Sequence, residues 1–224
     1  MTTIRLILCL AVVFCFDHAA GGRAANAKDL GVDPIAQQTP EWCWAAASEM
    51  VLSYYNVPNL NPGRNYQCGV VGAQGGMCRI NCAMCLNGGG TTQRVAEVIK
   101  AYVKAAAMMA DFNDGDINIR TTGILSPQRI IDTIDADAPI IAGITPNSIP
   151  YPPGMGFSQH AVVIVGYDGN PGNLRVIIND PYPYPPYAVP YLQIGGQMLQ
   201  PGQYEIPYVH FVGLFHYGNS ITFN

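Results

Sequence analysis

The chain has 224 residues, of which 49% are hydrophobic and only 12% are charged, and its formal net charge at pH 7 is −4. A chain of this length can bury a substantial core in one domain or in two packed lobes, and the composition is the opposite of that of a disordered protein. The acidic balance provides no basic surface, so we expect neither nucleic acid nor an anionic membrane as a partner.

Residues 1–27 are typical of a secretory signal peptide. Arg5 precedes the apolar run LILCLAVVFCF (6–16), and the small-residue sequence AANA (24–27) follows it. A positive start, an apolar segment of about 11 residues and an A-x-A site characterise such leaders. We therefore expect cleavage before Lys28 and a secreted or periplasmic protein.

Two other interpretations of this leader are weaker. The apolar run is shorter than the roughly 20 residues that span a bilayer, so a retained membrane anchor is the second choice. A lipoprotein is less favoured, because AVVFC, which ends at Cys15, lacks the small residues of lipoprotein sites. After cleavage we expect no stable membrane insertion and a mature domain of residues 28–224.

A helix is predicted to begin at Thr39 and to carry Cys43. Thr39, Pro40 and Glu41 are residue types preferred at the N-cap, the first helical position and the first turn, and the alanine-rich sequence continues to about Tyr55. The unpaired N–H groups and the positive end of the dipole at a helix N-terminus stabilise an anion. Cys43 is therefore a candidate nucleophile in its thiolate form.

Residues 56–90 are rich in Gly, Asn and Cys and have no sustained period, so we expect a loop held by its cysteines. Removal of the leader leaves Cys43 and a cluster of four further cysteines: Cys68, Cys78, Cys82 and Cys85. In an oxidising compartment the cluster should form two disulfides, with three pairings open, and Cys43 should stay unpaired. Tetrahedral zinc held by four thiolates is the alternative, which export disfavours because exposed thiols oxidise there.

Two further helices are predicted in the first half of the chain. Thr91 or Thr92 is expected to cap one, and Ser126, followed by Pro127, to cap the other. In both, apolar residues recur at helical spacing. These positions are Val95, Val98, Ile99, Tyr102, Val103 and Ala106, and then Ile130, Ile131 and Ile134.

The sequence pattern of the second half of the chain is typical of β-strands. β-branched runs at 139–145, 160–168 and 174–180 predict strands, and a Gly-Asn-Pro-Gly turn joins the last two into a hairpin. The proline- and tyrosine-rich segment 181–191 is expected to be irregular, and YVHFVGLFHY (208–217) to be a final strand. Helices first and strands afterwards predict an α+β fold.

Candidate catalytic partners of Cys43 lie on the predicted hairpin. Cys–His catalysis needs a base and a third group that orients the imidazole. His160 opens one strand, and the return of the chain through the hairpin brings Asn179 or Asp180 back beside it. The Cys43 amide and a Gln side chain just upstream of it are candidate donors to an oxyanion.

Three separated segments resemble the papain-like cysteine peptidases, in particular their compact bacterial secreted and effector members. They are QQTPEWCWAA, HAVVIVGYD and IINDPYP. Their order and local context match that family, which places a Gln six positions before the nucleophile and a Trp directly after it. The resemblance implies that Cys43 is the nucleophile, His160 the base and Gln37 the oxyanion donor, with Gln38 as an alternative of the same chemistry.

The resemblance also bears on the third catalytic member. The compact bacterial members carry an acid immediately before Pro, which favours Asp180, with Asn179 as the alternative. Tyr182 then stands where papain has a shielding Trp. The departures from papain include two at the catalytic residues: residues 40–42 are Pro, Glu and Trp instead of Cys, Gly and Ser, and the nucleophile and base are closer in sequence than the roughly 130 to 150 residues expected.

The implied fold is a papain-like α+β fold with two lobes. The N-terminal helical lobe, about 28–137, carries the Cys43 helix and packs on a C-terminal antiparallel β lobe, about 138–224. Segments 143–159 and 181–204 are expected to supply the walls of the substrate pocket.

The implied function is that of a secreted cysteine endopeptidase. It hydrolyses a protein or peptide substrate through a thioester acyl-enzyme, with no metal or organic cofactor. Transfer of the same acyl group to an amine would instead make the protein a transamidase or peptide cyclase. A rival from another class is a catalytically silent binding or toxin module that uses 181–191 as its contact surface.

Overall fold

The computed structural model describes residues 26–86, 89–110, 112–113, 115, 117–146 and 159–223. The expected leader lies outside the described residues except for its last two positions, and so do residues 147–158 of the expected pocket segment. Within the described parts of the chain, no helix is both long enough and apolar enough to cross a membrane.

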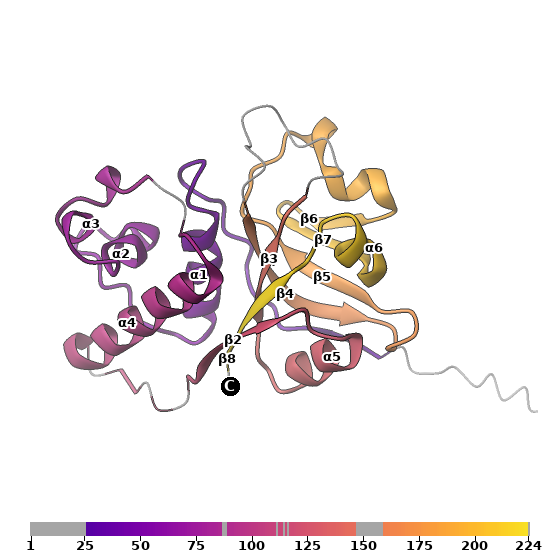
Figure 1. Ribbon diagram of the computed structural model, residues 1–224, viewed down its shortest axis with the longest axis horizontal. Coiled ribbons are helices and arrows are strands. Elements are labelled where there is room, and N and C mark those ends of the chain that lie inside the picture. Colours follow the sequence, from indigo (N-terminus) through magenta and orange to yellow (C-terminus); the bar gives the residue numbers. More distant parts are fainter. Residues whose placement is uncertain are drawn as a thin grey trace, which may run out of the picture.

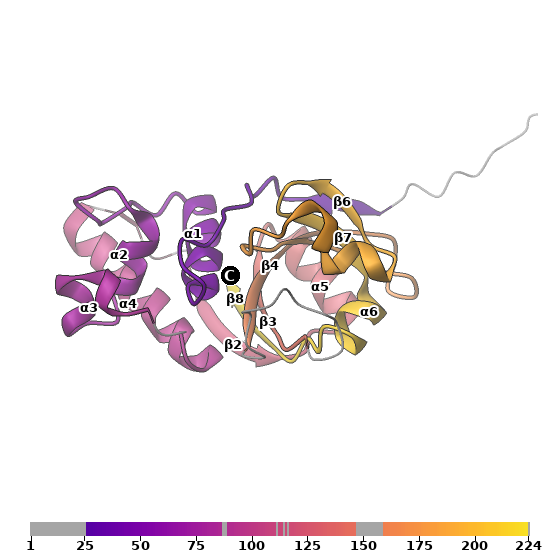
Figure 2. The ribbon, with the colours of Figure 1, turned by 90° about the horizontal axis from the view of Figure 1, so that it is seen from above.

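A helical lobe lies beside an antiparallel sheet, and both views place helix α1 between the other helices of that lobe and the sheet (Figures 1 and 2). The helical lobe contains α1 (Cys43–Tyr54), α2 (Tyr66–Gly72), α3 (Met77–Ile80), the 3₁₀ turn η1 (Cys82–Met84) and α4 (Thr92–Ala110).

The sheet has strands from both halves of the chain. They are β1 (Ala27–Asp29), β2 (Ile119–Gly123), β3 (Ile140–Ile144), β4 (His160–Asp168), β5 (Arg175–Asn179), β6 (Gln197–Gln200), β7 (Gln203–Pro207) and β8 (Asn219–Phe223). Their order is β2-β8-β3-β4-β5-β7-β6, and β1 pairs with β4. The helices α5 (Pro127–Asp135) and α6 (Tyr208–Gly213) and the 3₁₀ turns η2 (Pro186–Ala188) and η3 (Pro190–Ile194) complete the described elements.

Apolar clusters cover both faces of the sheet. Successive residues of a strand point to opposite faces, so Val163 packs with the helical lobe, whereas Ile164 packs with Ile130 and Ile134 of α5. Burial on both faces explains why the sequences of β3, β4 and β5 are almost continuously apolar.

The later helices and the hairpin are confirmed. Helix α4 buries the predicted positions, and the Oγ1 of Thr91 accepts a hydrogen bond from the Arg94 N–H at 3.2 Å. Ser126 caps α5 by accepting from the Arg129 N–H. Strands β4 and β5 pair antiparallel, as the turn between them predicted.

Two predictions of local structure are wrong. Segment 208–217 is mostly helix α6, and β8 is the last strand. Phe211 is fully buried, and Tyr208 and Val212 pack against the same apolar cluster. The spacing of these three residues fits a helix in a short apolar run that periodicity alone does not resolve. Residues 56–90, expected as a loop, contain α2, α3 and η1.

The helical lobe is shorter than the predicted span of 28–137. Strand β2 lies within that span but pairs with β8 along its whole length. Apolar residues of α5 pack on the sheet face opposite the helical lobe. The helical lobe therefore ends with α4, because the chain from β2 onward is held by strand pairing and by the second apolar cluster.

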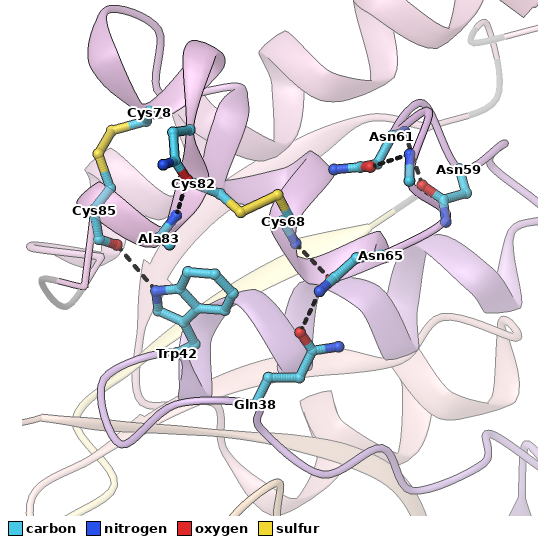
Figure 3. Close-up of a disulfide and its surroundings, with 12 residues drawn as sticks. Gln38, Trp42, Asn59, Asn61, Asn65, Cys68, Cys78, Cys82, Ala83 and Cys85 are labelled. Atoms are coloured by element: carbon cyan, nitrogen blue, oxygen red, sulfur yellow. Dashed lines mark hydrogen bonds between the residues drawn. A yellow bond between two sulfur atoms is a disulfide. The ribbon is translucent and has the colours of Figure 1, made fainter.

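Two disulfides hold together the short elements of the helical lobe (Figure 3). Cys68 of α2 bonds to Cys82 of η1, and Cys78 of α3 bonds to Cys85. This is one of the three pairings that the sequence left open. Because all four clustered thiols are oxidised here, the zinc alternative does not fit the structure. Cys43 is free and buried.

Removal of the Cys68–Cys82 disulfide should destabilise the fold. The bond closes a loop with a sequence separation of 14, and a closed loop of about this length contributes about 3 kcal/mol by restricting the unfolded chain. We expect the Cys68→Ala/Cys82→Ala variant to lose about that free energy of unfolding in a denaturant titration. The shorter Cys78–Cys85 loop should give a smaller loss in the matched double variant. Equal stability of both variants and the native chain would contradict this.

Candidate active site

Cys43 is the first residue of α1, at the helix N-terminus. The predicted cap at Thr39 is wrong, because Trp42 occupies the N-cap position without a side-chain cap and the Trp42 N–H closes a turn on the Thr39 carbonyl at 3.2 Å. The Cys43 N–H therefore belongs to the first turn of the helix, whose N–H groups have no intrahelical partner.

The side chain of Gln37 explains why the helix begins so late. Its Nε2 donates to the carbonyls of Thr39 and Pro40, at 2.8 and 2.9 Å. In a longer α-helix these two carbonyls would accept from the N–H groups of Cys43 and Trp44. Gln37 thus binds the Thr39 carbonyl, which in a longer helix would accept a hydrogen bond from the Cys43 N–H.

This geometry also limits what Gln37 does in the resting protein. A carboxamide nitrogen carries two N–H groups, and the two carbonyls can occupy both. The Gln37 Oε1 is buried and has no hydrogen-bond partner among the described residues. Gln37 donates directly to an oxyanion only after exchanging one of these carbonyls, so its predicted role stays a prediction. The alternative, Gln38, directs its Oε1 to the Asn65 Nδ2 at 2.6 Å.

His160, the first residue of β4, lies against both Cys43 and Asp180. Its Nε2 is 2.7 Å from the Asp180 Oδ1, and its ring also forms a side-chain hydrogen bond with Cys43. Because Nε2 is directed at the carboxylate, Nδ1 is the nitrogen left for the thiol. The structure therefore brings together the three residues that the sequence proposed as nucleophile, base and orienting acid.

Strand register brings Asp180 to the imidazole. Val163 pairs with Asn179 and Ile164 with Ile178, so continuing this register places Asp180 diagonally across from His160. Diagonal neighbours on one face lie within reach of long side chains. Asn179 points elsewhere, because its Nδ2 donates to the Val32 carbonyl at 2.7 Å.

The Asp180 carboxylate is buried, and each of its two oxygens accepts two hydrogen bonds. Oδ1 accepts from the Tyr182 N–H at 2.8 Å in addition to facing His160. Oδ2 accepts from the hydroxyls of Tyr184 and Tyr191 at 2.9 and 2.6 Å. These donors fix the plane of the carboxylate and therefore the direction from which it meets the imidazole.

The environment of His160 favours the imidazolium. Burial is the largest influence and lowers its pKa, but the charges of Asp180 and Cys43 and the hydrogen bonds to both raise it, and the balance gives a pKa of about 10. At neutral pH the ring therefore keeps both protons, one shared with the carboxylate and one directed to the sulfur.

The sequence did not identify Tyr184 and Tyr191 as parts of the site. Both belong to the segment 181–191, which was predicted to be irregular and contains only the 3₁₀ turn η2 and the start of η3. Their hydroxyls reach Asp180 through the fold of that segment, and no local periodicity signals such a contact. The high tyrosine content of the segment was the one available hint.

A mainly apolar pocket of about 330 Å³ lies beside Asp180. Ile35 and Ala36 line one part of it, and Tyr182, Tyr184 and Tyr204 line another. Residues of segment 181–204 thus border a cavity next to the site, and their role as a wall of the substrate pocket stays a prediction.

Comparisons with known proteins give one family match. The Peptidase_C39 like family matches residues 29–197. A solved double glycine motif protease from an AMS/PCAT transporter, in complex with the leader peptide, is 19% identical, with 87% of this chain and 92% of that chain covered and a TM-score of 0.44. A putative C39-like peptidase from Bacillus anthracis is 13% identical, with 87% and 95% covered and a TM-score of 0.46. No curated protein matches the chain.

The raised pKa of His160 predicts how stability depends on pH. The folded state holds the imidazole proton up to about pH 10, whereas the unfolded chain releases it near 6.5. The stabilisation is therefore fully present below about pH 6.5 and is lost as the pH rises through about 10. We expect the free energy of unfolding of the native chain to fall over this range relative to that of His160→Gln, in denaturant titrations at matched pH. A constant difference between the two proteins would contradict the assignment.

Proposed function

The chain belongs to the Peptidase_C39 like family and is thus a cysteine peptidase of the papain-like clan, and we propose that it is an exported endopeptidase that uses Cys43, His160 and Asp180. The observation that carries the proposal is the continuous contact from the thiol through the imidazole to the carboxylate. Peptides are the substrates of such an enzyme.

The chemistry begins from a thiolate and imidazolium pair. The Cys43 sulfur attacks the carbonyl carbon of the substrate, and the electrons of the C=O bond move to its oxygen. The Cys43 N–H stabilises that oxyanion, and Gln37 assists by holding the Thr39 and Pro40 carbonyls away from this N–H or, after exchanging one of them, by donating directly. His160 gives its Nδ1 proton to the leaving amine as the C–N bond breaks, which leaves a thioester on Cys43.

The second half-reaction restores the enzyme. His160, now neutral, takes a proton from a water molecule, and the resulting oxygen nucleophile attacks the thioester. The C–S bond breaks, the acid product leaves, and the thiolate and imidazolium pair is restored. Asp180 orients the ring and favours its charged form in both halves.

Export is supported by the oxidised cysteines. Disulfides persist in oxidising compartments and are rare in the cytosol, and this chain pairs four cysteines while its candidate nucleophile remains free. The sequence of residues 1–27 provides the second line of support. We therefore assign the protein to the periplasm or the exterior of the cell.

The apolar pocket beside Asp180 suggests what part of a substrate binds there. Its walls of proline, tyrosine and aliphatic side chains suit an apolar side chain. Because His160 protonates the leaving amine and Asp180 lies beyond it, we expect the pocket to receive the leaving side of the peptide.

The first experiment measures whether Cys43 is activated. We expect an epoxysuccinyl inhibitor near neutral pH to add once to the folded protein, with the adduct on Cys43 in the intact and peptide masses. His160→Ala should lose the adduct, since the thiolate then lacks its counter-ion. Tyr66→Phe, which removes a hydroxyl outside the site, is the matched control and should react normally. A Cys43 that is inert even to iodoacetamide would refute the proposal and favour the silent binding module.

The second experiment compares variants and products. On a mixture of denatured protein substrates, Cys43→Ala should have no activity. Asp180→Ala should retain measurable turnover at a rate lowered roughly 100-fold, because an orienting group contributes less than the nucleophile. Product masses should show only added water, even when a simple amine is supplied. Products that carry the amine would identify a transamidase instead, and full activity of Cys43→Ala would remove the mechanism.

A further inference from the structure

The side chain of Gln67, in α2, contacts the backbone on both sides of Gln37. Its Nε2 donates to the Ala36 carbonyl at 3.0 Å, and its Oε1 accepts from the Gln38 N–H, also at 3.0 Å. This carboxamide therefore pairs with the segment 36–38 as a neighbouring strand would. Gln67 is completely buried, where each lost hydrogen bond leaves a polar group unsatisfied.

The same carboxamide also reaches the helix that carries the nucleophile. The second N–H of Gln67 donates to the Oε2 of Glu49 in α1, at 3.0 Å. One side chain thus links the backbone around the candidate oxyanion residue to the helix of Cys43. Its three hydrogen bonds, to Ala36, Gln38 and Glu49, together join the segment 36–38 to helix α1.

The opposite side of the segment is held by the β lobe. The Gln37 N–H donates to the Pro181 carbonyl at 2.8 Å, directly after Asp180. Gln37 is therefore fixed between α2 on one side and the end of the β5 strand on the other. Gln67 provides the contacts from the helical lobe, because it hydrogen-bonds to the backbone of Ala36 and Gln38.

The support of Gln67 is itself rigid (Figure 3). The next residue, Cys68, forms the disulfide to Cys82, and Asn65 caps α2 by accepting from the Cys68 N–H. The indole N–H of Trp42 donates to the Cys85 carbonyl at 3.0 Å. The disulfide-bonded elements therefore contact both ends of the chain between Gln37 and Cys43.

We infer that Gln67 is a positioning residue that acts through Gln37. By holding the backbone at 36–38, it keeps the Gln37 amide on the Thr39 and Pro40 carbonyls and leaves the Cys43 N–H for an oxyanion. This inference rests on the acyl-transfer chemistry proposed above. It assigns Gln67 to formation of the tetrahedral intermediate and not to formation of the thiolate.

Two small probes separate these roles without a natural substrate. p-Nitrophenyl acetate acylates Cys43 through a tetrahedral oxyanion, and the burst of p-nitrophenol that Cys43→Ala lacks measures that step. Iodoacetamide alkylates the same sulfur by direct displacement, in which no oxyanion forms. A residue that positions the oxyanion donors should affect the first rate and spare the second.

We expect Gln67→Met, which keeps the length of the side chain and removes its hydrogen bonds, to slow acylation about 10-fold. Gln37→Ala should slow it about 100-fold, the loss typical of one oxyanion donor, because the Thr39 and Pro40 carbonyls then become available to the Cys43 N–H. Alkylation by iodoacetamide should stay within about twofold of the native rate in both variants. In the double variant, Gln67→Met should add less than about twofold to the effect of Gln37→Ala, because residues that act through each other are not additive.

Tyr66→Phe is the matched control for loss of a buried hydrogen bond in α2. It removes the hydroxyl that donates to the Val57 carbonyl and that also hydrogen-bonds with Tyr102, and it leaves the contacts of Gln67 in place. We expect a lower Tm with unchanged acylation. If Gln67→Met fails to fold, Gln67→Asn, which keeps a neutral carboxamide but is too short to reach all three partners, should show the same selective loss of acylation.

Three results would overturn the inference: fully additive effects of the Gln67 and Gln37 variants, equal slowing of acylation and alkylation, or native acylation in Gln67→Met. These outcomes differ from a failure of the proposed function. A protein whose Cys43 is acylated by the ester but which cleaves no peptide would refute the endopeptidase and leave the role of Gln67 intact.

Discussion

A buried carboxylate is the constraint on which this site depends. An ionised group withdrawn from water is stable only when it is paired and hydrogen-bonded, and Asp180 is 2% exposed. Two tyrosine hydroxyls and one backbone N–H saturate it, and His160 is its ionic partner. Segment 181–191 must therefore fold back over the end of β5, and the imidazole must face Cys43 with its remaining nitrogen.

The site also couples two lobes with different means of stabilisation. The β lobe is held by a continuous antiparallel sheet with apolar clusters on both faces. In the helical lobe, α2 and α3 are too short to persist on their own, and two disulfides fix them instead. Oxidation of the four clustered cysteines thus secures the surface on which the Gln37 segment rests, so the proposed export would bear directly on the geometry of the site.

The elements predicted from sequence are those whose patterns are local. Helix α4, helix α5 and the β4–β5 hairpin follow from caps, periodicity and a turn, all within a few residues of one another. The start of α1 was misplaced because the Gln37 side chain competes for the first carbonyls of the helix, and cap preferences do not include such a competitor. The contacts of Tyr184 and Tyr191 with Asp180 were missed because only the folded path of their segment creates them.

The choice between Asn179 and Asp180 shows where sequence reasoning reaches its limit. Both are chemically able to orient an imidazole, and they are adjacent in the chain. Neighbouring residues of a strand project to opposite faces, so a shift of one residue in register exchanges them. The pairing of Val163 with Asn179 directs Asn179 to the Val32 carbonyl and Asp180 to His160. The register of the hairpin therefore decides which of the two residues faces His160, and this is a property of the paired strands that neither residue carries alone.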